Sequence, residues 1–155
     1  MIKNKKLGFS LVEMIVSIAI GAILVAAVVV SFSSFRNNKI VDISADQILS
    51  VINEARVKAV SSEDYSRFGV RLEAGRVVFF KGDIFTEPNS SNIETPLSLL
   101  VEISDISLNG GGADIVFQKL TGKTSNYGSL RVRLKSDNNK YKTISVKSTG
   151  IANIQ

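Results

Sequence analysis

Residues 5–14 read Lys-Lys-Leu-Gly-Phe-Ser-Leu-Val-Glu-Met, and they begin the segment that decides the fold of this chain. After them the sequence carries no charged residue from Met14 to Phe35, a run of 22 residues. As an α-helix this run spans roughly 33 Å, enough to cross the hydrocarbon core of a bilayer. The segment therefore predicts an apolar helix over residues 9–35 that anchors the chain in a membrane, with a polar domain after it.

The composition of the whole chain averages over two unlike parts. Of its 155 residues 45% are hydrophobic, but 19 of the 24 residues in 9–32 are apolar, and the remainder is ordinary for a soluble domain. The chain has no Cys and no His, which excludes disulfides, thiol nucleophiles, the usual zinc sites and Ser–His catalysis. Its acidic residues show no recognisable metal-ligand spacing. We therefore expect a protein that is not an enzyme and that holds no metal or cofactor.

The charges beside the apolar run predict its orientation. Three lysines precede it within residues 3–6, whereas only Arg36 and Lys39 follow it closely, offset by Asp42. Positive charge is retained on the cytoplasmic side of a membrane. The sequence thus predicts a single-pass membrane protein with a cytoplasmic N-terminus and an exported C-terminal domain.

A cleaved secretory signal is the alternative interpretation of this run. Two observations argue against it. The run is longer than the apolar region of a signal peptide, about 7–15 residues. Glu13 also lies near its start, where an unpaired carboxylate is costly to bury.

The N-terminal stretch resembles the processing site of type IV prepilins and type II secretion pseudopilins. In that family a short basic leader ends in Gly, the mature chain begins with Phe, and a glutamate follows at the head of a long apolar helix. The resemblance implies that residues 1–8 are a prepilin leader, that prepilin peptidase cuts between Gly8 and Phe9, and that Phe9 is then N-methylated. It also implies that Glu13 pairs with the N-terminal amine of a neighbouring subunit during assembly on an inner-membrane platform.

Physical chemistry agrees with these implied roles. A glycine at the cut leaves room for a protease to approach the backbone. A carboxylate paired with an amine satisfies two charges that are costly in an apolar bundle, and such pairs fix register. Major pilins often carry Pro and Gly inside the apolar helix, but here the prolines are Pro88 and Pro96, and Gly21 is the one interior glycine. A continuous helix suits a minor subunit or pseudopilin at least as well as a major one.

Beyond the anchor the apolar residues recur at spacings of three and four. That spacing predicts the amphipathic half of the same helix over residues 36–62, packed on the domain that follows. No Pro or Gly falls between Ala22 and Gly69, so one helix from about residue 9 to about residue 61 is expected. The residues of its buried face are Val41, Ala45, Ile48, Ile52, Ala55 and Ala59.

Residues 63–155 change to a period of two, which predicts an antiparallel β-sheet globular domain and an α+β fold. The resemblance implies that this fold is pilin-like. A hairpin is expected first, followed by a polar loop at Gly82–Thr95 and a flexible turn at Gly110–Gly112. The helix end, the early hairpin, and the Thr121-Gly122 and Thr149-Gly150 steps resemble the GspH/FimT-type branch of minor (pseudo)pilins. The expected strands are 68–72, 76–80, 99–103, 115–118, 129–135 and 141–147.

The positive charge gathers at the C-terminal end. Residues 119–155 have a balance of +7, and Arg131, Arg133 and Lys135 alternate with apolar residues along one expected strand. Such a row of cations on one face could follow the phosphates of DNA. It could equally be a solvated face, or one that meets the acidic surface of another subunit. The Gly150–Asn153 stretch lacks the arginines with which some FimT-type DNA receptors bind DNA.

The sequence therefore predicts a minor pilin or pseudopilin, a structural subunit of a type IV pilus or a type II secretion pseudopilus. Its expected partners are other subunits, prepilin peptidase, the assembly platform, and membrane lipid before assembly. The alternative is a DNA-binding minor pilin for DNA uptake in competence. The choice between pilus, secretion and competence systems stays open at this level, as do copy number, filament position, ligand and envelope type.

Overall fold

The computed structural model describes residues 9–155, apart from the side chains of residues 29–34. The predicted leader, with Gly8, lies outside the described residues. The chain divides into two compact units, one ending at Arg36 and a globular one over Asn37–Gln155, and we describe each by itself. The domain boundaries drawn from the sequence stay predictions.

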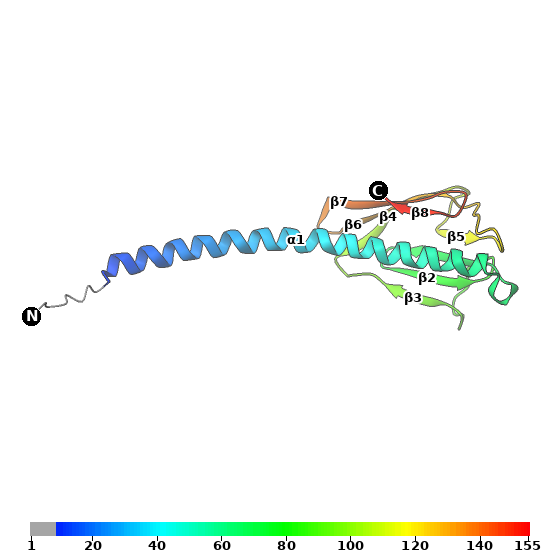
Figure 1. Ribbon diagram of the computed structural model, residues 1–155, viewed down its shortest axis with the longest axis horizontal. Coiled ribbons are helices and arrows are strands. Elements are labelled where there is room, and N and C mark those ends of the chain that lie inside the picture. Colours follow the sequence, from blue (N-terminus) through cyan, green and yellow to red (C-terminus); the bar gives the residue numbers. More distant parts are fainter. Residues whose placement is uncertain (1–8) are drawn as a thin grey trace, which may run out of the picture. The chain divides into compact units, whose positions relative to one another are not determined.

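Helix α1 covers Leu11–Val60, a span of 50 residues, close to the predicted limits (Figure 1). Its ends are consistent with the helix dipole, because Glu13 lies in the first turn and Lys58 in the last. The helix ends where Ser62 takes a left-handed conformation with φ 51°. A short 3₁₀ helix, η1 (Glu63–Tyr65), then leads into the first strand.

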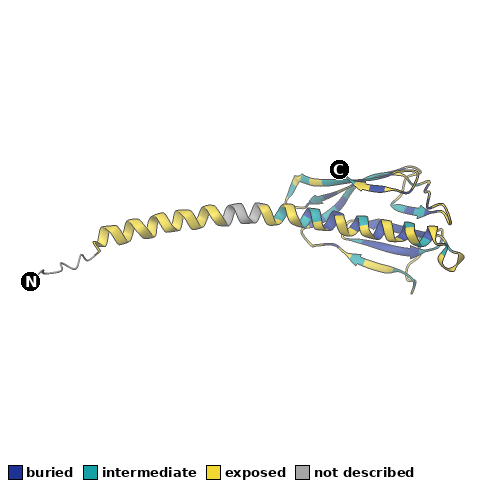
Figure 2. Ribbon diagram, viewed as in Figure 1, coloured by how far each residue is buried: buried dark blue, intermediate teal, exposed yellow. Residues whose placement is uncertain are grey.

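The part of α1 within the globular unit buries one face, as the spacing predicted (Figure 2). All six residues of the predicted face are buried, and Val51 joins them. The polar residues between them are exposed or half-buried, with the exception of Ser44, which is buried. The helix is therefore held by the packing of this face, as is usual for helices in proteins.

Eight strands form two four-stranded antiparallel sheets, which confirms the α+β fold class. The first sheet has the order β3-β2-β1-β5 and the second β4-β6-β7-β8. The strands are β1 (Phe68–Glu73), β2 (Arg76–Lys81), β3 (Ile93–Pro96), β4 (Val101–Leu108), β5 (Asp114–Phe117), β6 (Gly128–Leu134), β7 (Asp137–Val146) and β8 (Ala152–Ile154).

The predicted hairpin is confirmed, since β1 pairs with β2 from Phe68↔Lys81 to Glu73↔Arg76. Two strands were not predicted. The residues of β3 fall largely inside the expected polar loop, where Ile93 pairs with Phe79, and β8 pairs with the end of β7. Both are short edge strands. Strand β3 is mostly exposed and ends at a proline, and β8 has only three residues, too few for an alternation to stand out in the sequence.

One hydrophobic core joins the buried face of α1 to both sheets. Its largest fully buried side chains include Ile48 and Ile52 from the helix, Phe117 from the first sheet, and Leu130 and Ile144 from the second. The helix is thus the element that both sheets share. Strand residues alternate in direction, so neighbouring side chains turn toward and away from this core, apart from the irregular pairings of β6 with β4 and β7.

A close contact between two glycines lies at the end of the globular unit where α1 ends. Gly122 follows β5 and Gly150 precedes β8, with left-handed φ values of 62° and 80°. A Cβ on Gly150 would collide with the carbonyl oxygen of Gly122, and a Cβ on Gly122 would lie 2.6 Å from Val60 Cγ2. The last turn of the helix and both sheets therefore meet where a side chain does not fit.

Candidate assembly surface

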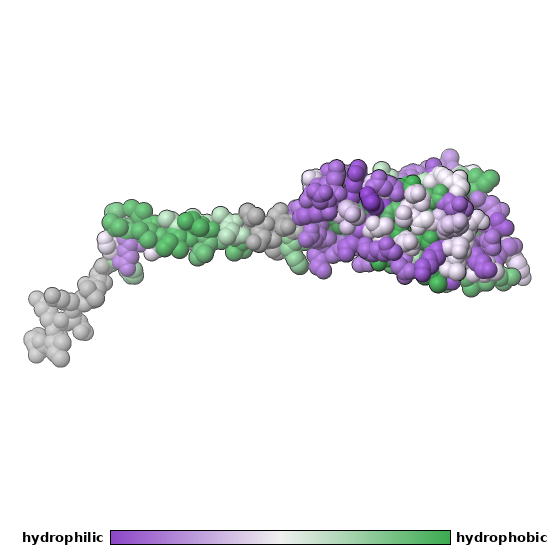
Figure 3. Space-filling view, turned by 90° about the horizontal axis from the view of Figure 1, so that it is seen from above, coloured by the Kyte–Doolittle hydropathy of each residue, from purple (hydrophilic) through white to green (hydrophobic). Residues whose placement is uncertain are grey.

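The N-terminal part of α1 is apolar and uncovered. Its window Leu11–Val28 has a mean hydropathy of 2.6, is long and apolar enough to cross a membrane, and has none of its residues buried. In the view of Figure 3 this part of the helix is coated by hydrophobic side chains, whereas the globular unit shows a mixed surface. The amphipathic pattern of residues 41–59 is absent here, because a helix that is apolar on every side has no polar face to turn to water.

The exposed area is far larger than soluble proteins tolerate. Eleven large apolar side chains between Leu11 and Val28 are exposed. Each is worth about 1.5–3 kcal/mol when fully buried, so the uncovered segment amounts to at least ~10 kcal/mol of unfavourable hydration. A surface of this kind requires lipid or other apolar helices around it.

Glu13 is the one charged side chain between Phe9 and Phe35, and it is exposed in the first turn of α1. The Ser17 hydroxyl donates to the backbone carbonyl oxygen of Glu13 at 2.7 Å, which leaves the carboxylate unused by that bond. Among the side chains that the structure describes, which exclude those of residues 29–34, none hydrogen-bonds to this carboxylate. A carboxylate in an apolar surrounding needs a cationic or hydrogen-bonding partner, so this position favours a partner from another chain.

Phe9 lies two residues before α1 and is 80% exposed. An exposed, irregular segment of this kind is accessible to a protease. Because Gly8 lies outside the described residues, cleavage between Gly8 and Phe9 and methylation of Phe9 stay predictions.

The predicted row of cations, Arg131, Arg133 and Lys135, agrees with the structure only in part. Arg131 and Arg133 do point outward from β6 between buried apolar neighbours. Each is paired with an acid of β4, however: Arg131 Nη1 lies 3.2 Å from Asp105 Oδ2, and Arg133 Nη2 lies 2.7 Å from Glu102 Oε1. Two of the three cations therefore have nearby counter-charges.

The third predicted cation of this face, Lys135, is exposed and lies one residue beyond the end of β6. Arg131 also lies over the ring of Tyr141, at 4.8 Å from its centroid. This arrangement resembles a solvated sheet face with cross-strand pairs more than a row of unpaired cations. DNA binding by Arg131, Arg133 and Lys135 stays a prediction that no observation here favours.

Sequence reasoning missed an ionic network on the outer side of the first sheet. The guanidinium of Arg76 contacts Glu73 at 2.7 Å, Glu94 at 2.8 Å and Glu87 at 3.0 Å. These hydrogen bonds, that of Glu73 foremost, raise the pKa of Arg76 above its ordinary range. The network fastens β3 and the loop before it onto β2, so its role is structural. Among the described residues no group of three or more acidic side chains could hold a metal ion.

A family model gives independent support to the N-terminal motif. The model for the prokaryotic N-terminal methylation motif matches residues 3–29. The match covers the basic stretch, the Gly-Phe step, Glu13 and most of the apolar run. The whole sequence matches no curated protein.

Solved structures of two related classes share the fold. The type IV minor pilin FimU of Pseudomonas aeruginosa, in two crystal forms, superposes with TM-scores of 0.56 and 0.59 at 10% identity, covering 74% and 78% of this chain and 91% and 92% of that protein. The minor pseudopilin EPSH from the type II secretion system of Vibrio cholerae superposes with a TM-score of 0.56 at 16% identity, covering 76% of this chain and 94% of that protein. The chain thus combines the methylation motif with the fold of minor pilins and pseudopilins.

Proposed function

We propose that this chain is a minor pilin or pseudopilin, a structural subunit that is anchored in a membrane and then assembled into a type IV pilus or a type II secretion pseudopilus. Support comes from the methylation motif over residues 3–29 and from the fold shared with minor subunits of both systems. The two classes give similar TM-scores, 0.56 and 0.59 for the minor pilin and 0.56 for the minor pseudopilin, so the proposal covers both. The structural neighbours are filament subunits, and we propose that this chain likewise has no enzymatic activity.

The observation that carries the proposal is the uncovered helix Leu11–Val28 with Glu13 near its start. Lipid tails and neighbouring apolar helices solvate such a surface about equally well. Moving the helix from bilayer to filament therefore gains little hydrophobic free energy, and close packing and polar pairs must supply the preference. A carboxylate at one fixed height on an otherwise uncharged helix is suited to that task.

In this mechanism the subunit is anchored in the membrane until assembly, and Glu13 sets its axial position in the filament. Cleavage before Phe9 creates an α-amino group, and that of a neighbouring subunit provides the cationic partner for the Glu13 carboxylate. A displacement by one helical turn, about 5.4 Å, would leave both charges unpaired in an apolar bundle, which is strongly unfavourable. The globular unit Asn37–Gln155 then forms the outer surface of the filament.

Intact-mass analysis of the mature N-terminus tests the proposal. We expect co-expression with a prepilin peptidase to yield a chain that begins at Phe9 and carries one added methyl group. Gly8→Asp should block the cut, because a side chain there obstructs the approach of the protease. Gly21→Ala is the matched control, since a Cβ at that position meets no atom within 4 Å. A different N-terminus, or cleavage that tolerates Asp at position 8, would overturn the processing mechanism.

A further inference from the structure

We propose that the globular unit also binds the surface of an anionic bilayer, through the end of the unit at which its helical segment begins. This inference rests on the proposed function, because it takes residues 9–35 to be the membrane anchor. It adds a second contact with the membrane, made by the exported domain before assembly.

The apolar part of this surface lies where the β3–β4 connection meets the start of the unit's helix. Leu99 is 88% exposed, the highest exposed fraction among the described large hydrophobic residues, and Leu100 and Ile43 are exposed with it. An open groove of about 350 Å³ runs between the helix, at Ile40 and Ile43, and the connection at Leu97. Several large apolar side chains gathered at one place are typical of a contact surface.

The position of this surface follows from connectivity within the unit. The helical segment of the unit starts at Asn37, directly after Arg36, and Ile43 lies only about 9 Å of helix rise beyond Asn37. The carbonyl oxygen of Leu100 accepts a hydrogen bond of 2.9 Å from the amide of Lys135, so the β6–β7 turn lies at the same end. Both connections are visible at that end of the globular unit in Figure 1.

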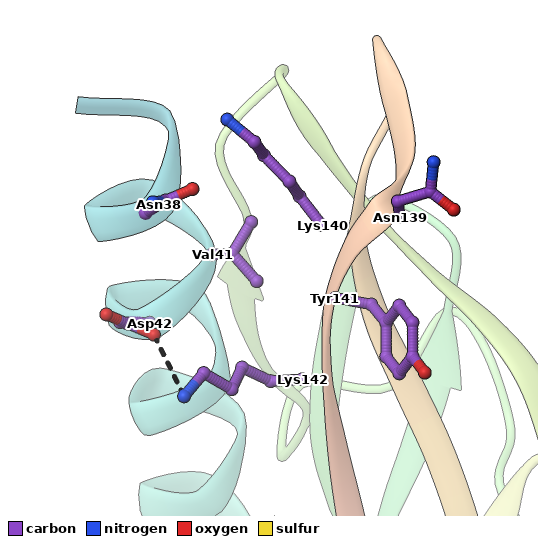
Figure 4. Close-up of a pocket in the computed structure, with 7 residues that line it drawn as sticks. All are labelled: Asn38, Val41, Asp42, Asn139, Lys140, Tyr141 and Lys142. Atoms are coloured by element: carbon purple, nitrogen blue, oxygen red, sulfur yellow. Dashed lines mark ion pairs between the residues drawn. The ribbon is translucent and has the colours of Figure 1, made fainter. Parts of the chain in front are cut away.

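Cationic side chains surround the apolar residues. Lys135 is exposed beside Leu100, and Lys140 extends from β7 past Val41 toward the start of the helical segment (Figure 4). Next to it, Lys142 Nζ lies 3.4 Å from Asp42 Oδ1 across an open groove of about 230 Å³. The four lysines at this end outnumber its three aspartates, which are Asp42, Asp46 and Asp137. The lysines are 39, 135, 140 and 142.

Leucines ringed by lysines fit the headgroup region of an anionic bilayer. The leucines reach the boundary of the acyl chains while the ammonium groups stay at the level of the phosphates. Because the anchor already holds the chain in the bilayer, the globular unit meets the lipid surface at a high effective concentration. A surface with only modest affinity for lipid therefore stays bound to it. This continuity with the anchor is why we choose lipid as the occupant over a second copy of the chain.

Single spin labels test the inference, since the chain has no native cysteine. The full chain is reconstituted in vesicles of phosphatidylcholine with or without 30% phosphatidylglycerol, and labels are placed at Leu99→Cys, Leu120→Cys and Ala26→Cys. Leu120 is the matched control, because it is 74% exposed and its amide bonds to Ala59 at the opposite end of the unit. Power saturation with oxygen and with a nickel chelate reports the depth of each label.

We expect the label at position 99 to be shielded from the nickel chelate in vesicles with phosphatidylglycerol and the label at 120 to stay accessible. Lys135→Ala should lower the ratio of shielded to accessible label at 99 about fivefold, the factor that corresponds to one lysine near an anionic surface. Lys147→Ala, an exposed lysine at the other end of β7, should leave it unchanged.

Each contrary outcome has a distinct meaning. Equal accessibility at 99 and 120, with position 26 in hydrocarbon, overturns this inference and leaves the anchor intact. Accessibility at 26 overturns the proposed function as well. Shielding at 99 that ignores phosphatidylglycerol and rises with the protein-to-lipid ratio identifies a second copy as the occupant and also overturns the inference.

Discussion

The contact between Gly122 and Gly150 permits a quantitative test of how the globular unit is closed. Gly150→Ala places a methyl group against the carbonyl oxygen of Gly122, and because that atom belongs to the backbone it cannot rotate away. Gly110→Ala is the matched control. Gly110 has a φ of 83°, close to the 80° of Gly150, but a Cβ there meets only Asn126 Nδ2 at 3.9 Å.

The expected cost separates into two parts. Both substitutions put a side chain into the left-handed region, which costs about 1–2 kcal/mol, and both restrict the unfolded chain equally. Gly150→Ala adds the displacement of a packed segment, about 1–3 kcal/mol. We therefore expect Gly150→Ala to lower the free energy of unfolding by about 2–5 kcal/mol and Gly110→Ala by about 1–2 kcal/mol.

Urea unfolding of the full chain in detergent micelles, followed by circular dichroism, measures both values. The difference between the two variants is the quantity of interest, because it cancels the backbone cost that they share. Equal destabilisation by the two substitutions would refute the claim that the helix end and both sheets are locked at this contact.

Three further predictions concern charge. Glu13→Gln keeps the helix long and apolar, so membrane insertion should persist. Co-sedimentation with filament subunits should fall about a hundredfold or more, because removing one partner of a buried ion pair costs about 3–5 kcal/mol. Unchanged co-assembly would contradict the role of Glu13 in setting the register. Arg131 and Arg133 are already paired with acids, so replacing both by Ala should change the slope of log K against log salt concentration for any DNA binding by clearly less than the ~2 expected for two free cations. A change of about 2 in a salt-titrated anisotropy assay would instead favour the DNA-binding alternative. The hydrogen bond and charge of Lys81 lower the pKa of Asp64 below 3.8, so the stability gained from Asp64 is present above that pH and is lost as the pH falls further. Asp64→Asn should therefore reduce stability at neutral pH and match the parent chain in strong acid, and a difference that persists in acid would assign the effect to something other than this titration.

The part of α1 that packs on the sheets was predictable because its pattern of apolar residues lies within one short stretch of sequence. The spacing of Val41, Ala45, Ile48 and the residues after them is set by the geometry of one helix, and all of them are buried. The inner strands were predictable for the same reason. The strands β3 and β8 were not, because β3 is mostly exposed and ends at a proline, and β8 has only three residues. The other two edge strands, β4 and β5, were predictable because buried apolar residues alternate along them.

The two candidate sites, the N-terminal motif and the charged face of β6, differ likewise in how far the sequence could predict them. The N-terminal motif is contiguous, so the sequence could identify Phe9 and Glu13 together, and the matched model over residues 3–29 agrees with that motif. The charge of the β6 face depends on Asp105 and Glu102, which come from a different strand. Only the pairing of β4 with β6 brings these acids opposite the arginines, and that pairing is not encoded at any fixed spacing.

The buried face of α1 has a mechanical consequence. This face extends from Val41 to Ala59 over roughly 27 Å of helix, and its side chains pack in one core with both sheets. A tensile load that enters the globular unit at Asn37 is directed along the helix axis, so these contacts are sheared together and share the load. Peeling them apart one by one would need a force across the axis. A domain built in this way resists a force that pulls its helix out along the helix axis.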